Sequence, residues 1–204
     1  MELSRRAVGA LTVAGISGLA GCSGSTSFSA EYAETDTGET GYERTGQRQP
    51  SMTRTFAGQE VTVTNTVTEY RKEVQLSLLG GSADVGVFAA FTSPQVEIAG
   101  RSFNPISDMD TEQLAERFQS RFDSMDGLGQ ESSEQVDVLG AARTVTKFSA
   151  TVTVEGNQVP VFLLIANFSH ESDVVVPMGI FPQERQDEEG PNVRQLMANL
   201  THPA

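Results

Sequence analysis

The sequence predicts an α+β domain, in which an antiparallel β-sheet is packed by two helices. Apolar residues alternate over 61–98 and again over 148–181, which predicts several strands. Between these regions, and again near the C-terminus, the apolar period changes to that of a helix. The predicted order is strands, one helix, more strands and a last helix.

The first strands lie among threonines. Val61, Val63 and Val67 recur on alternate positions, which predicts a strand with one apolar face. The pattern repeats at Val74, Leu76 and Leu78, before a turn at Gly80-Gly81, and then over 85–91 and 96–98 on either side of Ser93-Pro94. The polar segment 34–41 has no apolar period and predicts a loop.

The first helix begins with a capping signal. Asp110 and Gln113 have the spacing of a capping box. Apolar residues then follow at helical spacing, and two glycines close the pattern: Leu114, Phe118, Phe122 and Met125, then Gly127 and Gly129. The sequence therefore predicts a helix from about 110 to 126.

A hairpin follows in the second half of the chain. After residues 134–138, apolar residues alternate over 148–154, Gly156-Asn157 predicts a turn, and the segment 159–168 predicts the return strand. The return strand is apolar at nearly every position, so we expect it to be central and covered on both faces, which two helices would achieve. A further strand over 174–181 is closed by Pro182.

The C-terminal segment predicts a charged loop and a short helix. Residues 184–189 are rich in acids and are expected to form a solvated loop. Apolar residues over 193–200 then predict the last helix.

The N-terminus has the order of an export signal. Arg5-Arg6 precede a weakly apolar stretch, too short for the about 20 residues of a membrane span. The pair resembles a twin-arginine signal, which directs folded proteins across the membrane. The stretch closes on Leu19-Ala20-Gly21-Cys22, which resembles a lipobox with Cys22 as the lipidated residue. We expect residues 1–21 to be the signal peptide, 22–27 a lipidated tether, and 28–204 one domain.

The composition of the chain limits the classes of partner and the surroundings that we expect for the protein. The net charge is −13 and the only lysines are Lys72 and Lys147. Such a domain repels itself in dilute salt, and molar salt screens that repulsion, so the composition indicates very salty surroundings. No basic patch is present to neutralise phosphates, which excludes a nucleic-acid role. Cys22 is the sole cysteine, so no disulfide or thiolate metal site is expected.

The sequence contains no motif that indicates a particular enzymatic reaction. His170 and His202 are the only histidines, neither accompanies a nucleophile elbow, and both are expected to be ordinary surface residues. Asp108, Asp110 and Glu112 resemble the start of a calcium loop, but Gln113 and Gln119 stand where its glycine and glutamate belong. We therefore predict no catalytic residue, no cofactor and no specific metal site.

Two sequons are candidate glycosylation sites in an exported protein. Asn167 is followed by Phe168 and Ser169, and Asn199 by Leu200 and Thr201. Asn167 ends a predicted strand, whereas Asn199 belongs to the predicted last helix.

The signal, lipobox and acidic composition together resemble exported lipoproteins of halophilic archaea, including a family of uncharacterised proteins. Short segments carry that resemblance within the domain, namely 104–106, 174–182 and 196–203. The element order also resembles the fold of PsbP-type photosystem accessory proteins, which implies an α/β/α sandwich and proteins that bind or assist partners.

The leading hypothesis is a non-enzymatic binding or accessory module, anchored to the outer face of the cell membrane through Cys22. Its partner would be an unidentified protein or small molecule. One alternative is a hydrolase whose residues meet only in the fold, and another is a weak cation-binding surface. A pocket joining His170 to a buried carboxylate and a serine would favour the hydrolase, and an apolar groove without such a trio would favour binding.

Overall fold

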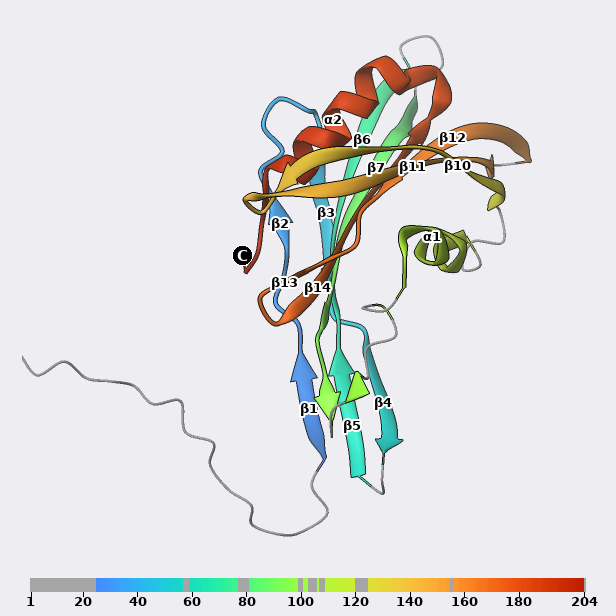
Figure 1. Ribbon diagram of the computed structural model, residues 1–204. Coiled ribbons are helices and arrows are strands. Elements are labelled where there is room, and N and C mark those ends of the chain that lie inside the picture. The colour runs from blue at the N-terminus through green and yellow to red at the C-terminus, as the bar shows by residue number, and fades with distance from the viewer. Residues whose placement is uncertain are drawn as a thin grey trace, which may run out of the picture.

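A computed structural model describes residues 25–56, 59–76, 81–98, 101–102, 106, 109–119, 125–154 and 156–203 (Figure 1). The main feature is an eight-stranded sheet in which every pair of neighbouring strands is antiparallel. Its order is β10 (Met125–Val138), β11 (Ala141–Val154), β12 (Asn157–Ile165), β14 (Asp173–Pro182), β7 (Gly81–Pro94), β6 (Thr66–Leu76) and β3 (Glu43–Arg48), with β13 (Phe168–His170) also pairing with β14.

A three-stranded sheet extends from one end of the large sheet (Figure 1). It consists of β1 (Thr26–Ser29), β5 (Gln59–Thr64) and β4 (Ser51–Phe56), with β1 parallel to β5 and β4 antiparallel to it. Two further pairs are short: β15 (Leu200–Thr201) with β2 (Glu34–Thr35), and β8 (Glu97–Ile98) with β9 (Arg101–Ser102).

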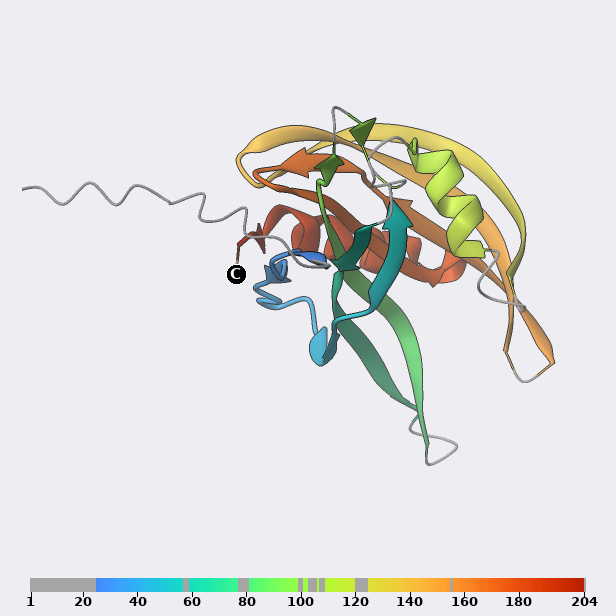
Figure 2. The ribbon, with the colours of Figure 1, turned by 90° about the horizontal axis from the view of Figure 1, so that it is seen from below.

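The two helices pack on opposite faces of the large sheet. Leu163 and Ile165 of β12 lie in one buried cluster with Leu114 and Ala115 of α1 (Thr111–Gln119). Leu164 of β12 lies in another with residues of α2 (Gln186–Ala198), which follows the 3₁₀ turn η1 (Gln183–Arg185). Figure 2 shows β10 and β11 curving around α1.

The predicted α+β class is wrong, because the protein is mostly β. The seven strands in line span six spacings of about 4.8 Å, or about 29 Å. The helices have 9 and 13 residues, lengths of about 14 and 20 Å, so they form no continuous layer and no α/β/α sandwich. Residues 43–48 and 51–56 carry few apolar side chains and gave no alternation, yet both segments are strands.

The hairpin prediction is confirmed. β11 and β12 pair antiparallel, with Val154 opposite Asn157 across the turn that contains Gly156. β12 is central, since it lies between β11 and β14. The predicted strand over 174–181 is confirmed as β14, which ends at Pro182.

The start of the first helix is confirmed, but its end is not. The backbone N–H of Gln113 donates to Asp110 Oδ1 (2.8 Å), and the backbone N–H of Asp110 donates to Gln113 Oε1 (3.2 Å), which is a reciprocal capping box. The helix ends at Gln119, and Met125 begins β10. Met125 is buried with Ala150 and Val161, so packing on the sheet overrides its helical spacing.

The acidic segment 184–189 was predicted to be a solvated loop, and this prediction is wrong. The segment forms part of η1 and the first turn of α2. Gly190-Pro191 is a turn signal in the sequence, yet both residues lie inside α2. Val193, Leu196 and Met197 are completely buried, and this packing overrides the local signal. α2 packs so closely on β14 that position 179 requires glycine, because a Cβ atom there would lie 2.4 Å from Val193 Cγ1.

Candidate functional site

An apolar groove of about 480 Å³ lies where the small sheet, α1 and the large sheet meet. This volume falls within the range of about 300–1,000 Å³ of small-molecule sites. The lining residues come from four strands, one helix and their flanks: Pro50, Ser51, Met52, Arg54, Thr55, Val61, Val63, Asn65, Phe91, Ser93, Ile106, Leu114, Arg117, Phe118, Val176 and Met178.

Strand pairing builds the wall from the small sheet. Met52 of β4 is opposite Val63 of β5, and Arg54 is opposite Val61, so these four residues share one face. The other face is polar. Thr53, which lies between Met52 and Arg54 in β4, is opposite Thr62 of β5, and their hydroxyl oxygens lie 2.8 Å apart. The alternation of polar and apolar residues therefore points the apolar face into the groove.

The other surfaces of the groove come from the large sheet and α1. Val176 of β14 is opposite Phe91 of β7. Val176 lies in one buried cluster with Leu114, and the partly buried Phe91 and Phe118 pack against that cluster. At the opening, Met52 is 41% exposed, one of two large apolar side chains so exposed in the described part of the chain. An exposed methionine beside a concave apolar surface suits a binding site, because its flexible thioether adapts to different shapes.

The groove differs in charge from the rest of the protein. The chain has a net charge of −13, but among the described residues that line the groove there is no aspartate or glutamate, and there are two arginines, Arg54 and Arg117. The low dielectric of apolar walls strengthens the field of these cations. The arrangement suits an apolar molecule with a negatively charged end.

His170 and His202 are not ordinary surface residues, contrary to the prediction. Their Nδ1 atoms lie 3.1 Å apart, and His202 is only 7% exposed. His202 Nε2 lies 3.0 Å from Oδ2 of the buried Asp173. The two histidines are 32 positions apart, so only the pairing of the C-terminal segment with the rest of the fold brings them together.

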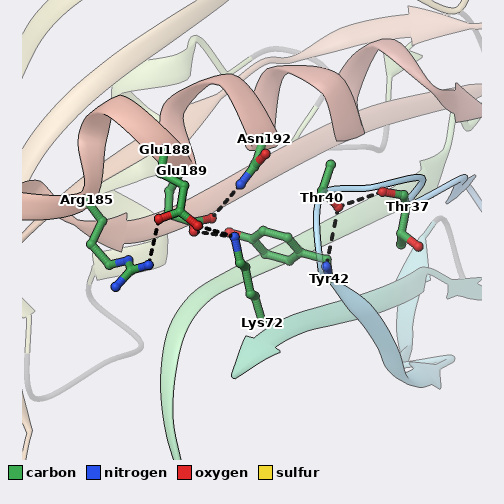
Figure 3. A network of polar contacts seen from close by, with 8 residues as sticks. All are labelled: Thr37, Thr40, Tyr42, Lys72, Arg185, Glu188, Glu189 and Asn192. Carbon is green, nitrogen blue, oxygen red and sulfur yellow. Dashed lines mark hydrogen bonds and ion pairs between the residues drawn. The ribbon is translucent and has the colours of Figure 1, made fainter. Parts of the chain in front are cut away.

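A second polar cluster is buried beneath α2 (Figure 3). Lys72 Nζ lies 2.7 Å from Oε1 of the completely buried Glu189 and 2.8 Å from Oε1 of the exposed Glu188. Burial lowers the pKa of Lys72, but hydrogen bonds to the two carboxylates and their charges outweigh it and raise that pKa overall. Burial beside Glu189 raises the pKa of Tyr42, whose hydroxyl lies in the same cluster.

The other acids considered from the sequence serve structural purposes. Asp110 caps α1, and Glu112 lies in the first turn of that helix, where negative charge offsets the helix dipole. Asp108 lies outside the described residues. Within the described part of the chain, the cluster of metal-ligating groups is His170, Glu171 and His202, which contains none of the predicted calcium-loop residues.

The two sequon asparagines both use their side-chain amides within the fold. Asn167 Nδ2 donates to the carbonyls of Met109 (2.6 Å) and Ile106 (3.2 Å). Asn199, which caps the C-terminus of α2, donates to the carbonyl of Asp36 (3.1 Å). Their use as glycosylation sites stays a prediction.

The residues of the predicted export signal and lipid attachment lie outside the described residues: Arg5, Arg6, Leu19, Ala20, Gly21 and Cys22. Neither described helix has the length and apolar character needed to cross a membrane. The first described strand, β1, begins at Thr26, so part of the predicted tether belongs to the small sheet.

The groove gave no signal in the sequence. Residues 50–55 are mostly polar, and Met52 becomes part of an apolar surface only through its register with Val63. The histidine cluster gave a partial signal, because His170 has acidic neighbours at Glu171 and Asp173. Its partner His202 is distant in the chain.

Comparison with known proteins places the chain in a family. No curated protein matches it significantly. Among solved structures, it is similar to the solution structure of cyanobacterial PsbP (CyanoP) from Synechocystis sp. PCC 6803, with 13% sequence identity, 92% of this chain and 98% of that chain covered, and a TM-score of 0.36. A family profile, "Domain of unknown function (DUF6517)", matches residues 29–201, and the chain belongs to that family.

Proposed function

We propose that the protein is a non-enzymatic binding module, anchored to the outer face of the cell membrane, and that its groove holds an anionic amphiphile with a single apolar chain. The observation that carries this proposal is the groove of about 480 Å³, whose described lining is mainly apolar and includes two arginines but no acid. An apolar groove without a trio of His170, a buried carboxylate and a serine was the arrangement expected of a binding protein, and His170 is not among the residues that line this groove.

The charge of the groove lining favours a ligand with a negative charge. A protein of net charge −13 repels anions at long range, so an anionic ligand needs local cations. Arg54 and Arg117 supply them from β4 and α1 respectively. A cationic amphiphile would meet these two positive groups and no carboxylate among the described residues of the lining.

The apolar walls supply most of the affinity. Each buried methylene group contributes about 0.8 kcal/mol, so eight methylenes contribute about 6 kcal/mol before the entropy cost of association. A charge-assisted contact with an arginine adds about 1 kcal/mol at a partly exposed site. The sum of about 7 kcal/mol corresponds to a Kd of about 10 micromolar before that cost, so we expect an affinity in the micromolar range or weaker and not a nanomolar one.

The proposed anchor would hold the groove close to the membrane. Thr26 is four positions after Cys22 in the chain, which permits a span of at most about 14 Å. Thr26 is opposite Val61 of β5, and Val61 lines the groove. A lipid on Cys22 thus keeps the small sheet near the bilayer surface, where amphiphiles are concentrated.

The histidine cluster does not favour the alternative of a hydrolase. His170, His202 and Asp173 do meet, but no serine hydroxyl in the described part of the chain hydrogen-bonds to either histidine. None of the three lines the groove. A serine mechanism needs its nucleophile within hydrogen-bond reach of the base.

The binding test uses the full chain, purified in molar KCl, and dodecanoate as the probe in isothermal titration. We expect one dodecanoate per chain with micromolar affinity, weaker binding of dodecanol and least of dodecylamine. Met52→Asp, which places an anion in the opening, should weaken binding more than tenfold. Arg54→Gln should weaken it about three- to fivefold.

Arg44→Gln is the matched control, because Arg44 is an exposed arginine that pairs with Glu34 away from the groove. This variant should bind dodecanoate like the parent protein. Absence of dodecanoate binding, equal binding of dodecylamine, or unchanged affinity in Met52→Asp would each refute the proposed ligand.

The anchoring proposal has a separate test. Cys22→Ser should release the protein into the medium or leave it unprocessed, and replacing Arg5 and Arg6 by lysines should block export. Fractionation into membrane, medium and cytoplasm, followed by mass analysis of the N-terminus, measures both. Normal export of the lysine variant would exclude the twin-arginine route and leave the proposed ligand unaffected.

A further inference from the structure

The histidine cluster lies apart from the groove and has its own chemistry. His170 ends β13, and His202 follows β15 near the C-terminus. Their Nδ1 atoms are 3.1 Å apart, and the ring planes are inclined by 76°. Two imidazole nitrogens face each other, and each neutral ring offers one lone pair.

Asp173 fixes the orientation of His202. Its Oδ2 atom lies 3.0 Å from His202 Nε2 and also accepts the backbone N–H of Glu31 (2.8 Å). The side chains of Asp173 and His202 are each 1% exposed. A carboxylate on Nε2 favours the tautomer with its proton there, which leaves the Nδ1 lone pair directed at His170.

Glu171 adds an oxygen ligand from the turn between β13 and β14. The turn is tight, since His170 is opposite Asp173 and Glu171 has φ of +52°. Ligand atoms of His170, Glu171 and His202 all lie within 4.8 Å of one another. Glu171 is exposed and His170 half-buried, so an ion has access from solvent, whereas His202 is buried.

We propose that His170 Nδ1, His202 Nδ1 and the Glu171 carboxylate bind Zn²⁺, with Asp173 as the carboxylate that orients His202. Two nitrogens about 2.1 Å from a tetrahedral zinc ion lie about 3.4 Å apart, within a few tenths of an ångström of the observed 3.1 Å. Two imidazoles and one carboxylate suit Zn²⁺, whereas Ca²⁺ and Mg²⁺ require oxygen ligands. Water completes the tetrahedron on the exposed side.

The site would join the C-terminal segment to the β13–β14 hairpin. Leu200 and Thr201 pair with β2, and His202 follows them directly. A metal held by His170 and His202 cross-links this segment to the large sheet. Binding to the folded state alone raises stability by about 2.7 kcal/mol at a zinc concentration one hundred times Kd.

The chain offers a specific spectroscopic test, because it contains just two histidines. In full-length protein labelled with ¹⁵N-histidine, every side-chain nitrogen signal reports this cluster. Zn²⁺, added in molar KCl, should shift the Nδ1 signals of both rings with one ion bound per chain. Co²⁺ should bind with the visible absorption of a tetrahedral complex.

Variants separate the site from general attraction to an acidic surface. His170→Ala and Glu171→Gln alter side chains that are not fully buried and should fold normally; we expect them to weaken zinc binding at least tenfold. Asp173→Asn should weaken it 10- to 100-fold. Glu188→Gln, which removes an exposed carboxylate at another site, should leave the affinity unchanged.

Unshifted Nδ1 signals at millimolar Zn²⁺ would overturn the proposal and leave a hydrogen bond between the two rings. Equal zinc affinity in His170→Ala and the parent protein would also overturn it, because binding would then belong to scattered carboxylates. Competition by Ca²⁺ at equal concentration would contradict the nitrogen ligands. Dodecanoate binding is expected to stay the same with and without Zn²⁺, so failure of one proposal does not affect the other.

Discussion

Replacing Lys72 by methionine tests how the buried cluster beneath α2 stabilises the fold. Met keeps the length of the apolar stem and removes the charge that faces Glu189. Lys72 has a side chain 13% exposed, and that of Glu189 is completely buried. The variant therefore leaves a carboxylate in the interior without its cation, while α2 still holds it there.

The magnitude follows from the geometry. At the observed 2.7 Å, two unit charges attract by about 6 kcal/mol with an effective dielectric constant of 20. Desolvation of both groups offsets part of that attraction, and loss of one partner from a buried pair costs about 3–5 kcal/mol. Glu188 adds less than about 1 kcal/mol, since its side chain is 54% exposed. We expect Lys72→Met to lower the free energy of unfolding by about 3–5 kcal/mol.

Thermal and urea unfolding in molar KCl measure the effect. For a chain of this size, 1 kcal/mol corresponds to about 2–4 °C, so we expect Tm to fall by about 10 °C. Lys147→Met is the matched control because it removes the other lysine. Lys147 lies 4.4 Å from the Phe162 ring centroid, a contact of about 0.5–1 kcal/mol at a partly exposed site.

The double variant Lys72→Met/Glu189→Gln isolates the buried charge. It removes the uncompensated carboxylate and should recover about 2 kcal/mol relative to Lys72→Met alone. The effect should persist at high salt, since salt screens a buried pair weakly. Equal destabilisation by Lys72→Met and Lys147→Met, or no recovery in the double variant, would refute this reasoning.

Two other predictions concern buried tyrosines. Gly86→Ala should cost about 1–3 kcal/mol in urea unfolding, because its Cβ would lie 2.0 Å from the hydroxyl oxygen of the buried Tyr42, whereas Gly46→Ala, with no atom within 4 Å, should cost less than 1 kcal/mol. Burial raises the pKa values of Tyr42 and Tyr70, so the unfolded chain loses these protons first; stability should hold below about pH 10 and fall above it. Thermal melts from neutral to alkaline pH measure this fall in stability. Tyr42→Phe should make the fall less steep. An unchanged slope in that variant would contradict the contribution of Tyr42 to the pH dependence.

Local structure was predictable where a few neighbouring residues determine it. Asp110 and Gln113 form the expected capping box because both halves of that motif lie within one turn. The β11–β12 hairpin was also predictable, since Gly156 has φ of +82° and alternating residues flank it. Only short-range interactions are needed in either case.

The sequence prediction failed where long-range packing opposes local signals. The acidic segment 184–189 indicated a solvated loop, but it forms part of η1 and the first turn of α2, a helix held on the sheet by the buried residues Val193, Leu196 and Met197. Met125 continued a helical pattern, but it packs with Ala150 and Val161 on the sheet. The polar strand β4 showed no alternation, because its partner β5 supplies most of the apolar surface.

By itself, the sequence determined the acidic charge, which follows from composition, and the short-range elements, which depend on neighbouring residues. Only the tertiary structure decided that the domain is mostly β, that Met52 and Arg54 face a groove, and that His170 meets His202. Alternation tells which side chains of a strand share a face, but not which strand lies beside it. Both candidate sites depend on that pairing, since each joins segments that are distant in the chain.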